Sequence, residues 1–329
     1  MEDSSLWTHI SQRMDAINKR TGRNMVQAVL TGALLVFIVV ASLIFNTQIF
    51  LWLIIAFVCV ALWELRVDFA TIGIRIPIVA LWIMTVATFL AIYYVPVRSS
   101  HSVVAAIGVV LTAAVVALVS TIRRSNHERV ERAVKKKLNK SVSGNASDKV
   151  DFDVHQESEP LRLTHVGASL LAVFYVTCLA SFIVLPLTRS HPVAFEFMII
   201  FLPSLGDIGG LIFGAAFGKH KLSPRISPKK SVEGLLGSIL FSVIGVIAIG
   251  WFTYDVNHFI QHAFVLVLMG ICVGIVGLFG DLCASMLKRD MGLKDMGHIL
   301  AGHGGVLDRV DSILMCAPVI CMFVMAFGL

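Results

Sequence analysis

The chain has 329 residues, of which 57% are hydrophobic and 15% charged, and its mean hydropathy is +0.84. Several apolar runs approach or exceed the roughly 18 to 20 residues with which a helix crosses a bilayer, and none shows the alternation of a membrane β-barrel. This composition argues against a soluble protein. It predicts an all-α fold, a polytopic integral membrane protein with about nine transmembrane helices and a polar site on the cytoplasmic side.

Residues 1–25 are polar, yet apolar side chains recur in them at helical spacing beside Arg13, Lys19 and Arg20. This pattern is typical of an amphipathic helix that lies on a membrane surface, and we expect one on the cytoplasmic side. A helix that binds a partner is the alternative. We expect no cleavable signal peptide, because the first apolar run is long enough to be a true span.

Nine apolar segments follow, and each is predicted to cross the membrane as a helix. The first four make up an N-terminal membrane region over residues 26–122. The last five belong to a second membrane region over residues 164–329, where we expect the functional site. The predicted spans are residues 26–45, 48–64, 76–95, 102–122, 164–187, 194–217, 232–252, 262–283 and 312–329.

Residues 123–163 separate the two membrane regions and change character midway. The first part, RRSNHERVERAVKKKLNK, is basic, and it is expected to extend the fourth span as a helix. The second part, SVSGNASDKVDFDVHQESEP, is polar, acidic and rich in turn-forming residues. We therefore expect a disordered cytoplasmic linker without chemistry of its own.

Lys and Arg accumulate in the cytoplasmic loops of polytopic proteins, so their positions orient the predicted spans. With the N-terminus inside, only Arg98 and Arg189 of the 27 Lys and Arg residues fall on the outer side. We therefore predict that the N-terminus and the loop between the last two spans are cytoplasmic.

Small residues in the spans are interpreted as packing residues. Glycines recur every fourth residue from Gly206 to Gly218 and again at Gly270 and Gly274, so each set lines one helix face. Small faces let helices approach closely in lipid. The cysteines lie within apolar runs or at their ends, which favours packing over disulfides or zinc ligation. They are Cys59, Cys178, Cys272, Cys283, Cys316 and Cys321.

Two aspartates lie at depths where a charge is costly, Asp207 within the sixth predicted span and Asp281 at the end of the eighth. Each needs a partner or a polar cavity, and a purely structural ion pair is the alternative interpretation. Asp281, Ser285 and Lys288 are spaced i, i+4 and i+7, so they share one helix face. Arg289 lies slightly around from that face.

A second helix face is predicted at the start of the last span, where Asp308, Asp311 and Ser312 are spaced i, i+3 and i+4. The sequence GHGG at residues 302–305 supplies backbone that adopts positive φ and brings N–H groups close to an anion. Carboxylates, basic side chains and a glycine loop together can hold a phosphate chain through a divalent metal. Carboxylate oxygens suit Mg²⁺, so we predict a magnesium–phosphate site.

A second basic loop, residues 218–234, is expected on the same side of the membrane. Ser227 and Pro228 match an N-cap and a first helical position. Lys229 and Lys230 would then sit at a helix N-terminus, where free N–H groups favour anions. The alternative is that these basic residues only set the topology.

The loop from Ser285 to Asp311 resembles the signature of the phosphatidate cytidylyltransferase (CDP-diacylglycerol synthase) family. That signature contains Ser-x-x-Lys-Arg, Lys-Asp-x-small, an aliphatic residue, His-Gly-Gly and Asp-Arg-x-Asp. Ala301 is the single departure, at a position where Pro, Gly or Ser is usual. The matching residues are Ser285, Lys288, Arg289, Lys294, Asp295, Gly297, Leu300, His303, Gly304, Gly305, Asp308, Arg309 and Asp311.

The upstream basic loop resembles two further segments of the same family. Phe217 to Leu222 fit Phe-Gly-Lys-His-Lys-Leu as they stand. Ser231 and Val232 replace the Thr and Trp of Ser-Pro-Lys-Lys-Thr-Trp-Glu-Gly. The resemblance extends over about residues 165–312, whereas the first four predicted spans match only in character.

The resemblance implies an enzyme of phospholipid biosynthesis, a nucleotidyltransferase that moves the cytidylyl group of CTP to phosphatidic acid and releases pyrophosphate. It also implies Mg²⁺, with a second cation left open, a homodimer, contact with membrane lipids and a bacterial inner membrane. We expect no nucleic acid partner. The residues agree with this reaction, because a lipid substrate explains a site at the bilayer and a polyanion explains basic cytoplasmic loops.

Residue roles are taken from the same resemblance and from the charge argument for Asp207. The predicted catalytic residues are Asp281, Asp308, Lys288, Arg289 and Arg309. The predicted metal ligands are Asp281, Asp308 and Asp311. The predicted substrate-binding residues are Ser285, Lys294, His303, Gly304, Gly305, Ser227, Lys229, Lys230 and Asp207. For His303 a structural role between the glycines is equally open.

Three other functions fit parts of the same pattern. A CTP-dependent lipid kinase or a CDP-ether-lipid synthase would share much of the site. A membrane transporter would also explain intramembrane aspartates. Inverted repeats with broken helices would favour the transporter, and the sequence has none, while its polar groups cluster at one face instead of forming a path.

Overall fold

The computed structural model describes residues 25–95, 101–142, 162–223, 227–293, 296–297 and 305–329. The predicted N-terminal amphipathic helix and the acidic linker lie outside these residues. So do Lys294, His303 and Gly304 of the predicted site.

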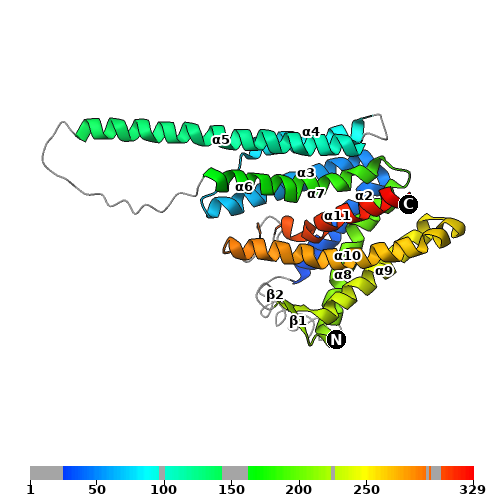
Figure 1. Ribbon diagram of the computed structural model, residues 1–329. Helices are drawn as coiled ribbons and strands as arrows, with labels where there is room; N and C mark the ends of the chain where they lie inside the picture. Colours follow the sequence, from blue (N-terminus) through cyan, green and yellow to red (C-terminus); the bar gives the residue numbers. More distant parts are fainter. Residues whose placement is uncertain (1–24, 96–100, 143–161, 224–226, 294–295, 298–304) are drawn as a thin grey trace, which may run out of the picture.

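The N-terminal half of the fold contains α2 (Met25–Phe45), α3 (Thr47–Thr71), α4 (Ile78–Tyr94) and α5 (His101–Val142). α4 and α5 lie side by side along one edge of the molecule (Figure 1). They approach closely because a Cβ on Gly108 would lie only 2.6 Å from Thr88 Cγ2. α5 continues through the basic stretch, which confirms that this stretch extends the helix.

The next apolar segment is a chain of short helical elements that together cover Leu163–Thr188. The elements are α6 (Arg162–Ala172), a π-helical turn (Val173–Cys178), α7 (Leu179–Val184) and a 3-10 turn (Leu185–Thr188). A π-helical turn shifts the following side chains around the helix, and such turns are frequent at functional sites.

The C-terminal half contains α8 (Pro192–Phe217), α9 (Val232–Thr253), α10 (Val256–Asp290) and α11 (Leu307–Phe327). Seven segments of the described chain are long and apolar enough to cross a membrane, and two further apolar helices are shorter, Leu30–Phe45 and Ile78–Tyr94. The chain is therefore a helical integral membrane protein, as its composition predicted. That nine helices cross the membrane stays a prediction.

The basic loop before α9 folds as a β-hairpin, the one departure from the all-α prediction within the described residues. β1 (Lys221–Ser223) pairs antiparallel with β2 (Ser227–Ser231). Lys229 and Lys230 therefore lie on a strand, and their predicted place at a helix N-terminus is wrong.

The predicted helix start at Ser227 and Pro228 is wrong for the same reason, because the cap of α9 lies four residues later. Ser231 has an extended backbone, and its hydroxyl accepts a hydrogen bond from the Gly234 N–H at 3.1 Å. Both serines have the side chain of a good cap. Strand pairing decides between them, because it holds the residues from Ser227 onward in extended conformation.

The glycine faces pack helices within the chain, as predicted. A Cβ on Gly210 of α8 would lie 2.6 Å from Ser238 Oγ on α9, and a Cβ on Gly274 of α10 would lie 2.6 Å from Ile239 Cα. The glycine faces of α8 and α10 therefore both pack against α9. The six cysteines, all among the described residues, are free thiols.

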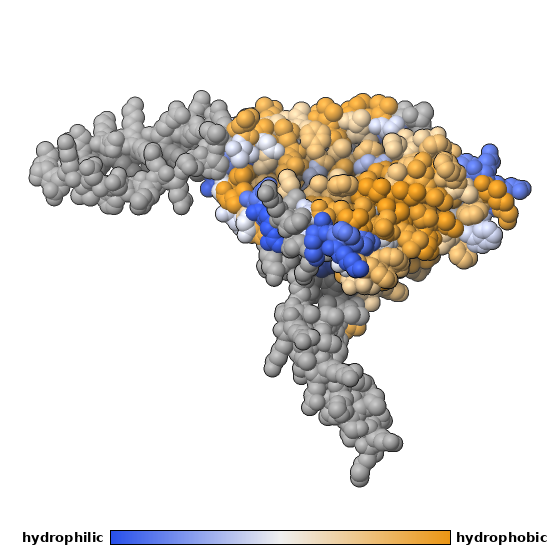
Figure 2. Space-filling model, turned by 60° about the horizontal axis from the view of Figure 1, so that its bottom comes forward, coloured by the Kyte–Doolittle hydropathy of each residue, from blue (hydrophilic) through white to orange (hydrophobic). Residues whose placement is uncertain are grey.

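Much of the surface is apolar, as expected for a protein that faces lipid. Figure 2 shows hydrophobic residues over most of the coloured surface, with hydrophilic residues gathered in separate patches. Leu211 and Phe264 are 73% and 78% exposed. Exposed apolar side chains of this number fit a hydrocarbon environment rather than water.

The last two helices extend beyond the predicted spans at their facing ends. α10 continues to Asp290 and α11 begins at Leu307. These ends point toward the same end of the molecule as the extension of α5 (Figure 1). The polar residues on both sides of the connecting loop therefore stand on helices, which fixes their relative positions.

Candidate active site

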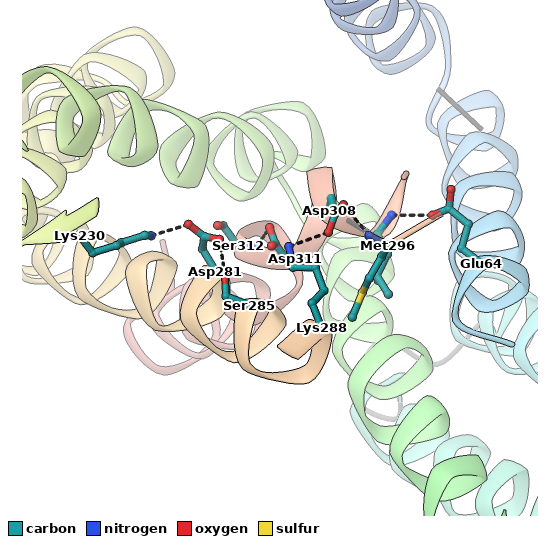
Figure 3. Close-up of polar contacts among 10 residues, drawn as sticks. Glu64, Lys230, Asp281, Ser285, Lys288, Met296, Asp308, Asp311 and Ser312 are labelled. Atoms are coloured by element: carbon teal, nitrogen blue, oxygen red, sulfur yellow. Dashed lines mark hydrogen bonds and ion pairs between the residues drawn. The ribbon is translucent and has the colours of Figure 1, made fainter. Parts of the chain in front are cut away.

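Three elements bring the predicted polar residues together. Asp281, Ser285 and Lys288 stand on the last turns of α10, Asp308 lies in the first turn of α11, and Lys230 reaches in from β2 (Figure 3). The shared helix faces that the spacing predicted are therefore present, and the two faces meet.

The first ion pair joins the hairpin to α10. Lys230 Nζ contacts Asp281 Oδ2, and the two side chains are 18% and 36% exposed. The Ser285 hydroxyl also points at Asp281 Oδ1, at a long 3.5 Å. Asp207 of α8 lies within electrostatic range of both Lys230 and Asp281. The hairpin thus contributes a cation to the site, although by a different local structure from the predicted one.

The second ion pair joins α10 to α11. Lys288 Nζ lies 2.9 Å from Asp308 Oδ1, and both side chains are nearly buried, at 13% and 12% exposed. The other oxygen of Asp308 accepts a hydrogen bond from the Met296 N–H at 2.9 Å. Asp308 therefore pairs with the Lys288 ammonium group and also accepts a hydrogen bond from the connecting loop.

Carboxylates outnumber lysines in this cluster. Asp311 is 5% exposed, its Oδ1 accepts a hydrogen bond from the Ser312 N–H at 2.7 Å, and it lies within electrostatic range of Asp281 and Lys288. With Asp207 the site has an excess of negative charge that would attract a cation.

The remaining described residues of the predicted site differ in their exposure and local structure. Arg289 and Arg309 are exposed. Gly305 is buried, and a Cβ there would collide with the carbonyl oxygen of Met296. Ser227 lies on β2, four residues before the cap.

Tyr175 is a residue of this site that the sequence did not indicate. It stands on the π-helical turn, and its buried hydroxyl makes no hydrogen bond to the described residues. The hydroxyl lies within electrostatic range of Asp281, Asp308 and Asp311. In the sequence it is one aromatic residue in an apolar run, and only the tertiary structure brings it near these carboxylates.

Glu64 is a second residue that sequence reasoning missed. It stands on α3, far from the signature, and it is 0% exposed. Its Oε2 accepts a hydrogen bond from the Leu307 N–H at 3.0 Å (Figure 3). A lone glutamate at the end of the predicted span 48–64 was the only signal.

The donor set suits a metal that the substrate helps to hold. Within the described ranges, no group of three His, Cys, Asp or Glu side chains converges as a metal site. Mg²⁺ often takes one or two protein carboxylates and completes its coordination with phosphate oxygens and water. Asp281 and Asp308 fit this use, because each presents a carboxylate beside a lysine that can pair with phosphate instead.

A bundle of apolar helices with paired carboxylates and lysines at one end defines a helical membrane protein with a charged site. The chain belongs to the cytidylyltransferase family, whose family model matches residues 26–327. The match begins in α2, so it includes the N-terminal helices, which resembled the family only in character.

Curated relatives agree with this membership. A protein of Escherichia coli (strain K12) called uncharacterized protein YnbB is 36% identical over 158 residues, which are 47% of this chain and 51% of the relative. A phosphatidate cytidylyltransferase of Staphylococcus haemolyticus (strain JCSC1435) is 40% identical over 154 residues, 46% of this chain and 56% of the relative.

A phosphatidate cytidylyltransferase of Synechocystis sp. (strain ATCC 27184 / PCC 6803 / Kazusa) is 44% identical over 122 residues, which are 36% of this chain and 39% of the relative. The chain thus spans about half the length of the curated relatives it matches.

Proposed function

We propose that the protein is a phosphatidate cytidylyltransferase, which converts CTP and phosphatidic acid to CDP-diacylglycerol and pyrophosphate. The observation that carries this proposal is the pair of carboxylate–lysine contacts, Lys230–Asp281 and Lys288–Asp308, at one end of a bundle of apolar helices. A water-soluble polyanion and a lipid can meet at such a place. Family membership and the names of two relatives support the same reaction.

In this reaction a phosphate oxygen of phosphatidic acid attacks the α-phosphorus of CTP. The bond between the α-phosphorus and the bridging oxygen to the β-phosphate breaks, and pyrophosphate leaves with the electron pair. The nucleophile is already ionised at neutral pH, so no general base is required. The protein contributes positioning and charge stabilisation.

The chain's own residues can perform both tasks. Lys288 and Lys230 exchange their carboxylate partners for phosphate oxygens, and the exposed Arg289 and Arg309 add positive charge at the entrance. Asp281 and Asp308, with Asp311 behind them, would hold Mg²⁺. The metal, when bound, neutralises phosphate charge as it develops on the leaving group. A second cation is a further proposal on the same excess of carboxylates.

We further propose that this site faces the cytoplasm of a bacterial cell and that the protein lies in the inner membrane. The positions of Lys and Arg support this orientation. So does the common direction of the α5 extension and the facing ends of α10 and α11 (Figure 1). A homodimer is also proposed, on the family resemblance alone, because both glycine faces are already packed against α9.

Purified protein in detergent with phosphatidic acid tests the reaction. CTP labelled in the cytosine ring should pass label into the lipid, with one pyrophosphate released for each lipid formed. ATP, GTP and UTP should give little of either. Lipid that gains phosphate without cytidine would identify a lipid kinase and overturn the proposal. Reaction only with an ether-linked lipid acceptor would identify a CDP-ether-lipid synthase.

A further inference from the structure

The first turn of α11 has no side-chain cap of its own in the described part of the chain. Val306 occupies the N-cap position with helical dihedral angles, and a valine side chain cannot accept a hydrogen bond. The N–H of Leu307, at the first helical position, is instead satisfied by Glu64 Oε2 at 3.0 Å. A carboxylate from another helix thus supplies the acceptor, and its charge also suits the positive end of the helix.

Two signature glycines leave the space for this carboxylate. Gly297 has a φ of +62°, and a Cβ there would collide with the Glu64 carboxyl group. A Cβ on Gly305 would lie 2.9 Å from Glu64 Oε2. Described residues on both sides of 298–304 therefore lie against Glu64, and glycine is required at each point of approach.

The same loop is tied to the candidate catalytic residues. The N–H of Met296, next to Gly297, donates to Asp308 Oδ2, and Asp308 follows Leu307 directly. Glu64 therefore binds Leu307 at the start of α11, and Asp308 is the next residue along the helix. Figure 3 shows Glu64 on α3 pointing at this junction.

We propose that Glu64 is a positioning residue of the active site. From the N-terminal helices, its buried carboxylate caps α11 in trans and fixes the loop, and this holds Asp308 in the place where it works. The N-terminal half thereby acts on the site rather than serving only as a membrane anchor. This inference rests on the proposed cytidylyltransferase function for its kinetic consequences, but not for its structural ones.

Glu196 provides a matched control. It is also a fully buried carboxylate on a membrane helix, but it stands in the second turn of α8, near Cys321, at the far end of α11 from Leu307. Glu64→Ala and Glu196→Ala therefore make the same chemical change at opposite ends of the bundle. Only the first removes the cap.

Activity should separate the two variants. If Glu64→Ala removes the free energy of one hydrogen bond to a charged group from the transition state, kcat should fall about 10- to 100-fold, measured per folded molecule by size-exclusion chromatography. Glu64→Gln keeps a carbonyl acceptor on a side chain of the same length, so its kcat should fall by less than that of Glu64→Ala. The Mg²⁺ concentration for half-maximal rate should rise in Glu64→Ala, because a displaced Asp308 binds metal less well. A smaller folded fraction cannot produce that rise.

Hydrogen–deuterium exchange tests the structural claim without any reaction. In unliganded protein, amides of residues 296–297 and 305–309 should exchange about 10-fold faster or more in Glu64→Ala than in wild type, and at the wild-type rate in Glu196→Ala. Unchanged exchange in Glu64→Ala would overturn the positioning role. If wild type lacked cytidylyltransferase activity but exchange changed as expected, only the proposed function would fail.

A double-mutant cycle gives the sharpest result. In wild type, Gly297→Ala should raise the amide exchange rate of this loop strongly, because its methyl group meets Glu64 and its φ is strained. In the Glu64→Ala background the collision disappears, so the same substitution should raise the exchange rate clearly less. Equal effects in both backgrounds would mean that Glu64 does not shape the loop, and would overturn the proposal.

Discussion

At the scale of single residues, two of the site's carboxylates are already paired with lysines. Lys288 and Asp308 are nearly buried and lie 2.9 Å apart, and Lys230 contacts Asp281. A buried charge without a partner is costly, so the lysines beside Asp281 and Asp308 stabilise these two carboxylates in the unliganded protein. In the proposed reaction, metal and nucleotide phosphate would replace both partners together without leaving a bare charge.

Asp308→Asn should abolish most activity while leaving the protein folded. Asparagine keeps the size of aspartate and one acceptor for the Met296 N–H, but it loses the charge that we propose to hold a metal. We expect a fall in kcat on the order of 10³-fold, measured by pyrophosphate release. A chelator should also stop wild-type turnover, and Mg²⁺ should restore it. Asp255→Asn, at an exposed position at the start of α10, is the control and should behave as wild type.

Folded Asp308→Asn protein with near-normal turnover would refute the metal assignment. Loss of folding with normal turnover in the surviving fraction would show that the pair with Lys288 is only structural.

Tyr175→Phe should lower activity without lowering stability. The Tyr175 hydroxyl is buried and makes no hydrogen bond to the described residues, so removing it takes away an unsatisfied polar group. If the hydroxyl contacts substrate phosphate, kcat should fall about 10-fold while the melting temperature stays level or rises. Tyr254→Phe removes a second buried hydroxyl without a described partner, outside the site, and is the matched control. Equal kcat for both variants would exclude a role for Tyr175.

At the scale of elements, α9 is the helix against which two others pack by their glycines. The contact with α10 decides where Asp281 and Lys288 stand, because both lie two or more turns beyond Gly274 on the same helix. The hairpin before α9 then aligns Lys230 with Asp281. A change in helix separation would therefore be transmitted to the ion pairs.

Gly274→Ala should separate α10 from α9 and lower stability. The added methyl group would meet the backbone of Ile239 at 2.6 Å, and backbone cannot move aside as a flexible side chain can. Overpacking of this kind costs about 1–3 kcal/mol, which a thermal melt in detergent would detect. Gly167→Ala on α6 meets nothing within 4 Å and should be neutral or stabilising by up to about 1 kcal/mol. The same melting temperature for both variants would contradict the packing argument.

At the scale of the whole molecule, the site lies where the two halves of the chain meet. α10, α11 and the hairpin supply the charged groups, while α3 supplies Glu64 and the π-helical turn supplies Tyr175. The facing ends of α10 and α11, which carry the charged groups of the site, point toward one end of the bundle (Figure 1). This arrangement requires one orientation in the membrane.

Cysteine labelling should report that orientation. With the native cysteines replaced by alanine, Ser223→Cys on β1 should react with an impermeant maleimide only after the cells are opened. Ser190→Cys, exposed before α8, should react in intact spheroplasts. Each variant is the control for the other, since both place a thiol at a polar loop. The reverse pattern would overturn the proposed cytoplasmic site.

The sequence by itself determined the membrane class and much of the site. Hydropathy and the cost of unpaired backbone groups in lipid leave helices as the form of each apolar run. Local spacing placed Asp281, Ser285 and Lys288 on one helix face, and all three stand on α10. These features depend on neighbours along the chain, which a sequence displays directly.

Only the tertiary structure decided which residues from distant segments reach the site. Lys230 contacts Asp281 from a strand, although its local sequence also fitted a helix start. Ser227 and Ser231 are both good caps, and pairing with β1 decides that the helix begins after the later one. Glu64 and Tyr175 looked like isolated polar groups in apolar runs. Long-range packing brings Glu64 of α3 to the start of α11 and Tyr175 near the carboxylates of the site. No local pattern in the sequence encodes that proximity.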